Sequence, residues 1–343
     1  MIDTMDKHSC ELFLEDALEI GRRLVETGAE VKRVEDTVRR ICIAYGFTDC
    51  EIYAVTSLIV ATIRDKDGNH YTQSVRVQSY GTDLGRLEEL NAFSRRICAQ
   101  VPDVEDLTRQ IRQYKKGKPK PVIKCLGYML AAGGFSVFYG GDLRDGLAAA
   151  AIAIVIYLMD YHLKLRQIHN VIYTFVAGFV SGLLALGLTR LGLGHQADKI
   201  MIGDIMLLIP GLLLVNAIKE MFNRDIVTGL YRLIEAVLVA LAISVTMNTI
   251  FAPVFMTFHK ITDTHILMCG GSIKSLITPI PMTKIITGLN WNVQWNFVFK
   301  KTIPFFWYPA HTITFMLPPD MRVLFAALLG IVLGVLLAVA ARK

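Results

Sequence analysis

Residues 171–188 read VIYTFVAGFVSGLLALGL, an apolar stretch that contains no charged side chain. Similar apolar runs occur at residues 122–139, 200–217, 230–246 and 323–341. Each run holds 17 to 19 residues, about the length that an α-helix needs to cross the hydrocarbon core of a bilayer. The first 120 residues contain no such run. We therefore predict an integral membrane protein with a sizeable soluble domain in front.

The composition agrees with this division. The chain is 53% hydrophobic with a mean hydropathy of +0.44, which is too apolar for an ordinary soluble domain. Residues 1–120 carry 19 Lys and Arg against 20 Asp and Glu, whereas residues 121–343 carry 17 against 10. The net charge of +6 therefore belongs to the membrane half, and it suits lipid headgroups better than nucleic acid.

No motif indicates a leader, a metal or a cofactor. Residues 1–6 are acidic and the first long apolar run starts more than a hundred residues later, so we expect no secretory signal. The six cysteines form no CxxC pair and no cluster with histidine, and we expect reduced small hydrophobes rather than disulfides or metal ligands. They are Cys10, Cys42, Cys50, Cys98, Cys125 and Cys269.

Four helices are expected in the soluble domain. Apolar residues repeat at helical spacing through residues 11–45, and Gly28 interrupts the pattern, which predicts two helices. Two more are predicted at residues 84–99 and 104–114. Residues 51–63 are rich in β-branched side chains and predict one strand, and a hairpin signal at Asp67-Gly68 leads into a second strand at residues 71–78. The expected fold is a small α+β domain.

The soluble domain shows no catalytic motif. Its candidate side chains match the spacing of no hydrolase, phosphate loop or metal site, and charged pairs on a helix surface are usually solvated. A membrane-anchored enzyme or sensor is kept as an alternative function, and we expect no enzymatic activity. The candidates are His8, Glu35, Asp36, Ser57 and His70.

A cluster of lysines just before the first apolar run marks the cytoplasmic side of a membrane, although a solvated linker is the alternative. With the amino terminus inside and a second span at residues 146–163, the basic residues of the short links fall mostly inside. We expect a cytosolic α+β domain over residues 1–120 and five spans over residues 121–246, in an α-helical bundle of about six spans. The lysines are Lys115, Lys116, Lys118, Lys120 and Lys124.

The run at residues 200–217 carries a carboxylate and a helix breaker. Asp204 lies about one turn inside the predicted membrane edge, where an ionised group is costly and tends to face water. Pro210-Gly211 interrupts the helix, and broken helices expose backbone groups to substrate in many transporters. On a regular helix Asp204 and Gly211 would share a face. Asn216 follows nearer the cytoplasmic end.

Each of these features also has a purely structural interpretation. Asp204 could cap the helix amino terminus at the interface, and Pro210 could be a kink. Glu235, a second acid in the next span, could pair with Arg232 and act as an anchor. In the run at residues 171–188, Thr174 and Ser181 share a face with two small residues; tight helix packing explains this face, and a polar pathway is the alternative.

The residues together resemble the ThrE-type threonine/serine exporter family over about residues 11–246. The resemblance rests on an ordered set of segments, of which each alone would be weak. They are GAEVKRVED at 28–36, the strand at 53–62, DLGRLEELN at 83–91, IGDIMLLIPG at 202–211, Asn216, and Gly229 followed by RLIEA at 232–236.

The resemblance implies a secondary exporter of small polar metabolites in the bacterial inner membrane. Members occur as one chain of about ten spans or as two subunits, and this chain resembles the larger subunit. A small four-span membrane subunit is therefore the expected partner, and a homo-oligomer remains open. Some two-subunit members are associated with export of C4-dicarboxylates such as succinate.

The chain departs from the family after about residue 246. Residues 247–320 contain short apolar stretches broken by prolines and lysines and accompanied by aromatics, which suits the membrane interface or a re-entrant loop better than a clean span. We therefore treat residues 247–343 as an atypical segment that ends in one transmembrane helix.

The leading hypothesis is a component of a proton-coupled exporter of threonine or serine. Asp204 and Glu235 would exchange protons, while the Pro210-Gly211 break and Asn216 would contact substrate. The face of Thr174 and Ser181 would line the path. A dicarboxylate exporter drawing anions through Lys219, Arg224 and Arg232 is the alternative within the transport class.

Overall fold

The computed structural model describes residues 5–78, 81–114, 121–165, 168–250, 252–272 and 278–318, and within 321–332 all but 323 and 326. The predicted last span at 323–341 and four of the five linker lysines therefore lie largely or wholly outside the described residues. The chain forms two compact units, Met1–Pro119 with Leu213–Leu233 and Lys120–Leu212 with Ile234–Lys343.

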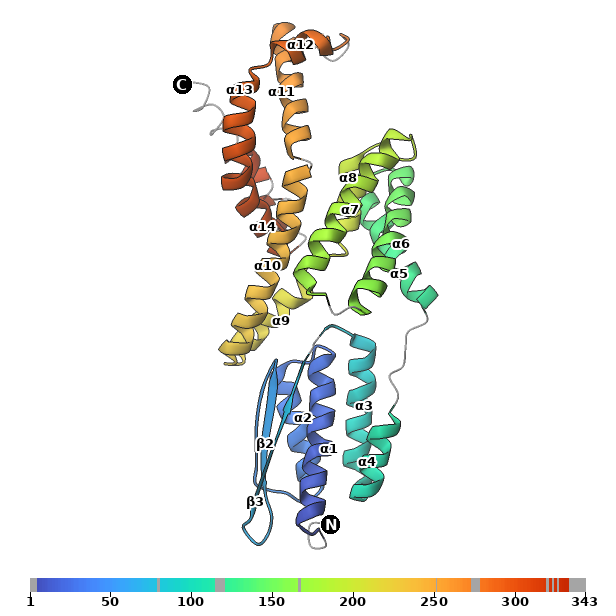
Figure 1. Cartoon of the computed structure of the whole chain (residues 1–343), viewed down its shortest axis with the longest axis vertical. Helices are drawn as coiled ribbons and strands as arrows, with labels where there is room; N and C mark the ends of the chain where they lie inside the picture. Colours follow the sequence, from blue (N-terminus) through green and yellow to red (C-terminus); the bar gives the residue numbers. More distant parts are fainter. Residues whose placement is uncertain are drawn as a thin grey trace. The chain divides into compact units, whose positions relative to one another are not determined.

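The amino-terminal residues form the predicted α+β domain (Figure 1). Helices α1 (Lys7–Glu26) and α2 (Val31–Ala44) pack on the sheet, while α3 (Leu84–Gln100) and α4 (Val104–Gln113) pack against α1 and α2. All four predicted helices are thus confirmed. Gly28 has φ +91°, and a Cβ there would lie 2.6 Å from the Gly81 carbonyl oxygen, so only glycine fits this helix stop.

The sheet corrects one sequence prediction. Its antiparallel order is β1 (Cys50–Val55), β2 (Leu58–Arg64) and β3 (His70–Arg76). Residues 51–63 are therefore two strands rather than one, because the chain reverses at Thr56-Ser57 and Val55 pairs with Leu58. Alternate residues of β2 are buried against the helices, as expected for a strand in a sheet with one buried face.

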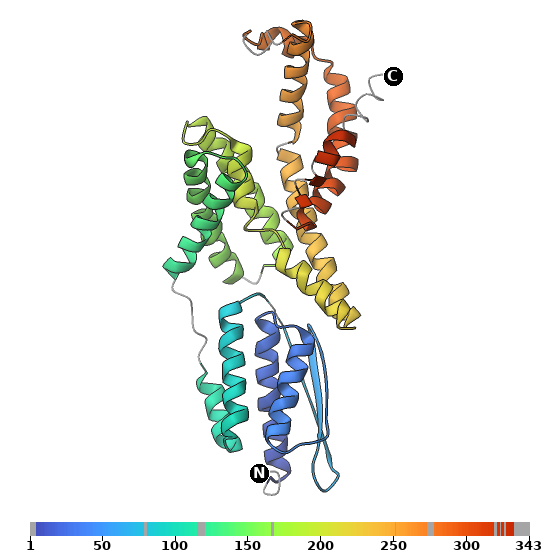
Figure 2. The same cartoon turned by 180° about the vertical axis from the view of Figure 1, so that it is seen from behind.

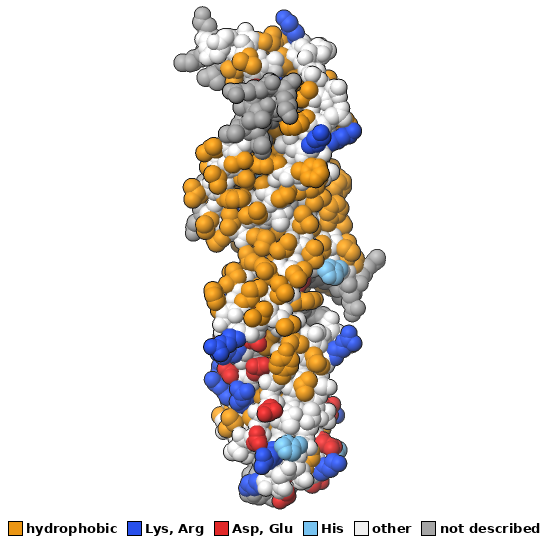
Figure 3. Space-filling model, turned by 90° about the vertical axis from the view of Figure 1, so that its left-hand side faces the viewer, with side chains coloured by type: hydrophobic (Ala, Val, Ile, Leu, Met, Phe, Trp, Pro, Cys, Tyr) orange, Lys and Arg blue, Asp and Glu red, His pale blue; other side chains and the backbone are white. Residues whose placement is uncertain are grey.

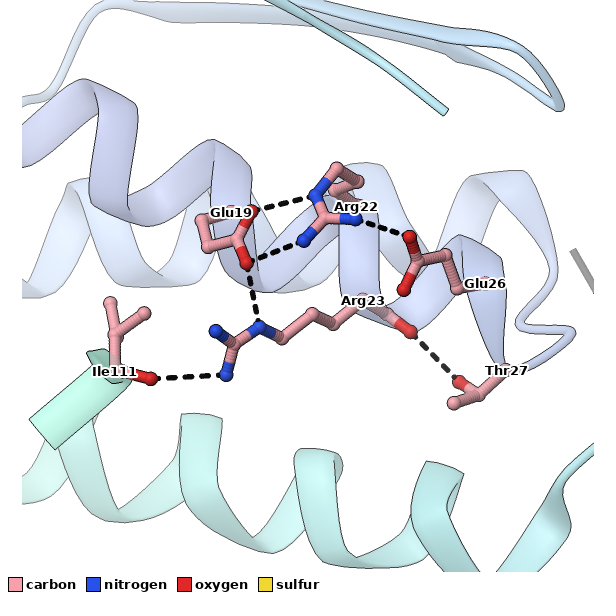
Figure 4. Close-up of polar contacts among 6 residues, drawn as sticks. All are labelled: Glu19, Arg22, Arg23, Glu26, Thr27 and Ile111. Carbon is pink, nitrogen blue, oxygen red and sulfur yellow. Dashed lines mark hydrogen bonds and ion pairs between the residues drawn. The ribbon is translucent and has the colours of Figure 1, made fainter. Parts of the chain in front are cut away.

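An ion-pair network fastens α1 to α4 (Figure 4). Glu19 accepts hydrogen bonds from Arg22 and Arg23 at 2.6 to 2.7 Å, and Arg22 also pairs with Glu26. Arg23 Nη1 donates to the Ile111 carbonyl oxygen of α4 at 3.1 Å. Burial acts to raise the pKa of Glu19, but the two guanidinium groups outweigh it and hold that pKa below its ordinary value.

Four described helices have the length and apolarity of membrane spans. They coincide with four of the predicted spans and lie in α5 (Pro121–Phe138), α6 (Leu143–Leu165), α7 (Asn170–Arg190) and α10 (Ile226–Ile250). Large apolar side chains such as Leu130, Phe138 and Leu147 are exposed on them, as lipid-facing surfaces require. Figure 3 shows hydrophobic side chains covering this part of the chain, whereas charged side chains gather over the α+β domain.

The predicted span at 200–217 is not one helix. It comprises α8 (Ala197–Ile205) and α9 (Gly211–Phe222), separated by turns. The carboxy-terminal segment is largely helical, with α11 (Ala252–Met268), α12 (Met282–Gly288), α13 (Trp291–Val293), the π-helix η3 (Gln294–Trp307) and α14 (Tyr308–Met316). Helix α11 packs against η3 (Figure 2). Together α11 and η3 form a carboxy-terminal helical hairpin, and the predicted interfacial or re-entrant character of this segment stays a prediction.

Candidate transport pathway

The break between α8 and α9 lies where the sequence predicted it. After Asp204 the chain continues through three turn residues, and Pro210 precedes the first residue of α9. Pro210 has no N–H to donate and disfavours helical geometry at the residue before it. Because the helix stops between them, Asp204 and Gly211 do not share a helical face, which corrects the expectation based on a regular helix.

Asp204 is fully buried and stands without a hydrogen-bond partner. Its exposed fraction is 0%, and neither carboxylate oxygen is bonded to any described residue. It is the eighth residue of a nine-residue helix whose N-cap is Gln196, so the helix-capping interpretation is wrong. Nor does Asp204 face open water here: α8 packs against α5, α6 and α7.

Close helix packing produces this burial. At Gly203 a Cβ would lie 2.5 Å from the Ala132 carbonyl oxygen and 2.9 Å from Ser136 Cβ, both on α5. Glycine therefore lets the backbone of α8 approach α5 to a distance that any side chain would prevent. The Ser136 hydroxyl is also buried without a partner among the described residues. The contact seals polar groups away from water.

Two other buried carboxylates of the same unit have partners. Asp145 accepts the backbone N–H groups of His195 at 2.7 Å and Gln196 at 3.0 Å, which positions the chain entering α8. Asp160 accepts hydrogen bonds from Lys124 Nζ at 2.8 Å and the Tyr128 hydroxyl at 3.1 Å. Buried charges are ordinarily paired in this way. Asp204 differs from these two carboxylates because neither of its oxygens has a partner among the described residues.

The α9–α10 hairpin carries a buried ion pair that the sequence analysis missed. Glu220 and Arg232 are 0% and 1% exposed, and Glu220 Oε1 lies 3.0 Å from Arg232 Nη1. Glu220 also accepts the Val31 N–H at 2.9 Å, while Arg232 Nη2 donates to the Ala29 carbonyl oxygen at 3.1 Å. The hairpin is thereby fastened to the connection between α1 and α2.

This ion pair corrects two expectations about Arg232. Its carboxylate partner is Glu220, twelve residues earlier, rather than Glu235. As a buried and paired side chain, Arg232 presents no cation to anions in this conformation, and Lys219 is paired with Glu30 at 3.2 Å. Sequence spacing gave no signal for the pair because its members face each other across the α9–α10 turn.

The other predicted pathway residues are dispersed. Thr174 and Ser181 are buried in α7, and the Ser181 hydroxyl donates to the Gly178 carbonyl oxygen of its own helix. A Cβ at Gly178 would lie 3.4 Å from Thr246 of α10, which is ordinary helix packing. Half-buried Glu235 belongs to the same unit as Asp204, whereas half-buried Asn216 belongs to the other unit.

A second polar feature of the helical unit lies between α10 and the carboxy-terminal hairpin. A cavity of about 250 Å³ is lined by Asp198, Met247, Asn248, Ala252, Met256, Trp307 and His311. His311 Nδ1 donates to Asn248 Oδ1 at 3.0 Å, and Asn248 Nδ2 donates to the Ser244 carbonyl oxygen at 2.8 Å. The Trp307 indole N–H is buried without a partner in the described part of the chain. Mostly apolar walls with a few fixed polar groups are typical of small-molecule sites.

Comparisons with known proteins support the motif-based resemblance. A family model described as "Putative threonine/serine exporter" (ThrE) matches residues 16–252. The chain is 27% identical over 224 residues to a "Probable succinate transporter subunit YjjP" of Klebsiella aerogenes, a match that covers 64% of this chain and 85% of that protein.

A "Probable threonine/serine exporter" of Mycobacterium tuberculosis is 25% identical over 241 residues, covering 68% of this chain and 44% of that longer protein. No solved structure matches the chain. The family match covers more than half of the sequence and includes α8, the break and all of α10. This membrane protein therefore belongs to the ThrE family.

Proposed function

We propose that the protein is a component of a proton-coupled secondary exporter of small amino acids such as threonine or serine. One observation carries the proposal: Asp204 is a fully buried carboxylate without a partner in the described part of the chain, placed just before a helix break. Removing an ionised carboxylate from water without compensation is far more costly than burying the neutral acid. The packed arrangement of α8 therefore favours protonated Asp204.

Ionisation would reverse this preference. A charged Asp204 needs water, and water reaches it only if α8 moves away from α5, where Gly203 sits against Ala132 and Ser136. The break at Pro210 gives α8 freedom to move without bending a continuous helix. Proton release and opening are thus the same event, which is the coupling that a secondary transporter requires.

The cavity at Asn248, Trp307 and His311 is the substrate site that we favour. Its volume of about 250 Å³ equals the liquid volume of about eight water molecules, which is enough for a small metabolite. The free indole N–H suits a carboxylate acceptor. Thr174, Ser181, Pro210, Gly211, Asn216 and Glu235 remain proposed members of the pathway.

A dicarboxylate such as succinate is the second candidate substrate, because the relative in Klebsiella aerogenes bears the name of a succinate transporter subunit. That name also supports the proposed partnership with a small membrane subunit. We propose a bacterial inner-membrane location with the α+β domain in the cytoplasm. The proposed organisation is residues 1–120, five spans over 121–246, and a carboxy-terminal part over 247–343. Membership of a transporter family favours this function over an enzyme or sensor.

Substituting Asp204→Asn tests the proposal, since asparagine mimics the neutral acid. Cells that express this variant and are loaded with labelled threonine or succinate should no longer show efflux driven by a pH gradient. Exchange of internal for external substrate should persist, because exchange needs no proton release. Asp67→Asn, a loop carboxylate on the surface of the α+β domain, serves as the matched control. Unchanged pH-driven efflux in Asp204→Asn would remove Asp204 from the mechanism, and selective efflux of one substrate would decide the cargo.

A further inference from the structure

A polar groove lies between α2 and α3 of the α+β domain, outside the pathway described above. Its volume is about 790 Å³, within the usual range for small-molecule sites. Lys32, Arg33 and Arg40 line it from α2, and Asn91, Ser94 and Arg95 line it from α3. These residues recur at helical spacing, so each helix turns one polar face toward the groove.

The groove has a surplus of positive charge. None of its four cations, Lys32, Arg33, Arg40 and Arg95, makes an ion pair within 4 Å in the described parts of the chain. Both acids of the groove are already engaged: Glu30 pairs with Lys219 at 3.2 Å, and Asp36 pairs with Arg39 at 3.7 Å. The lining therefore carries four cations against two acids, a net charge of +2 that favours an anionic ligand.

The lining of the groove includes a largely buried side chain with spare bonding capacity. Asn91 is 8% exposed, and its side-chain amide makes no hydrogen bond to any residue that the structure describes. The neighbouring Ser94 hydroxyl donates to the Asn91 carbonyl oxygen at 2.9 Å and can still accept. Asn91 and Ser94 thus offer directional contacts beneath the cations.

The groove also touches the α9–α10 hairpin. Asn223, in the connection between these helices, lines it together with Glu30. Three residues earlier, Glu220 holds the first N–H of α2 and the buried Arg232. A ligand in the groove would therefore contact both the α+β domain and the hairpin that begins at the Pro210 break.

We propose that this groove is an effector site for a soluble metabolite with two or more anionic groups, either carboxylates or phosphates. Arginine forks match both groups with paired hydrogen bonds, and Arg33 and Arg40 lie seven residues apart, or about two turns, on the same side of α2. Occupancy would bridge α2, α3 and the hairpin, and so stabilise the hairpin's attachment to the α+β domain. The site goes beyond the proposed transport function and does not require it.

Calorimetry on the full chain in neutral-lipid nanodiscs tests the site, with succinate, citrate and inorganic pyrophosphate as separate probes. We expect saturable binding of at least one probe, and the strongest one identifies the anionic group. The double substitution Arg33→Gln/Arg40→Gln should raise Kd by about tenfold or more, because it removes charge-assisted hydrogen bonds to the anionic ligand. Asn91→Ala should weaken binding by a smaller factor.

Arg109→Gln is the matched control, because Arg109 is an exposed arginine of α4 that does not line the groove. It should leave Kd within about twofold of the parent, as expected for a surface charge. Three results would overturn the proposal: no saturable binding of any probe at millimolar concentration, equal weakening by Arg109→Gln, or binding seen only to vesicles of anionic lipid. Efflux of threonine or succinate without added probe is measured in parallel, so failure of this site stays distinguishable from failure of the exporter.

Discussion

Asp204 and Glu220 are both completely buried carboxylates, one on each side of the Pro210 break, yet their surroundings differ. Glu220 forms an ion pair with Arg232 and accepts a hydrogen bond from the Val31 N–H, whereas Asp204 has no partner among the described residues. The paired acid fastens an element in place, and the Arg232 guanidinium lies beside its charge. The unpaired acid can be tolerated only while neutral. The comparison separates a structural carboxylate from one suited to carry a proton.

The largest effect is expected from breaking the paired side of this comparison. Arg232→Met leaves Glu220 buried and largely uncompensated, so thermal unfolding of the purified protein should show a loss of about 3–5 kcal/mol. Adding Glu220→Gln to the same variant should recover most of that loss. Arg224→Met, at an exposed arginine of the same hairpin, is the control. If Arg232→Met lowers the free energy of unfolding only slightly, or if the double variant recovers none of the loss, the ion pair does not stabilise the hairpin.

The next effect concerns the seal over Asp204. Gly203→Ala places a Cβ 2.5 Å from the Ala132 carbonyl oxygen, and overpacking of this kind costs about 1–3 kcal/mol. Gly134→Ala on α5 meets no atom within 4 Å and should instead stabilise by about 0.5 kcal/mol. Unfolding of both variants in detergent measures the difference. Equal behaviour would mean that α8 does not pack closely on α5.

A smaller effect is expected at the proposed substrate cavity. Trp307→Phe keeps an aromatic ring but removes the unpaired indole N–H, and losing one hydrogen bond to substrate costs about 1 kcal/mol. Efflux assays should therefore show KM raised about fivefold with little change in maximal rate. Trp295→Phe, at an exposed tryptophan of the same helix, should leave KM unchanged. Equal KM values for both variants would place substrate elsewhere.

The smallest effect is a pH dependence in the α+β domain. The folded-state pKa of Glu19 lies below its ordinary value of 4.5, so the folded protein binds fewer protons there than the unfolded chain. This stabilisation is present above pH 4.5 and is lost as the pH falls through the folded pKa. For partly exposed pairs it should amount to about 0.5 kcal/mol. Glu19→Gln should flatten the acid side of the stability curve, and an unchanged curve would contradict the assignment.

Local signals in the sequence predicted the elements well where turn chemistry was explicit. Gly28 and Pro210 each strongly restrict or permit a particular backbone conformation. The predicted helix boundaries at both residues are present in the structure. The reversal at Thr56-Ser57 was missed because neither residue is a strong turn former, and the strands continue on both sides. Sequence analysis therefore misses turns that are set by strand pairing in the folded protein rather than by the residue types in the turn.

The candidate site was only partly accessible from sequence. Asp204 could be singled out because an acid in an apolar run is costly wherever it lies. Glu220 with Arg232, and Asn248 with His311, meet across 12 and 63 residues, distances at which no periodic pattern indicates contact. Whether an acid has a partner depends on how the helices pack, and the sequence pattern does not contain that information.

The central claim is that Asp204 is protonated while α8 is packed against α5. Infrared difference spectroscopy of the purified protein at neutral pH, comparing the parent with Asp204→Asn, reports the carbonyl stretch of a buried neutral carboxylic acid directly. We expect such a band in the parent at neutral pH, absent from the variant and lost when transport substrate and alkaline pH open the site. Finding no protonated-acid band that depends on Asp204 would contradict the account.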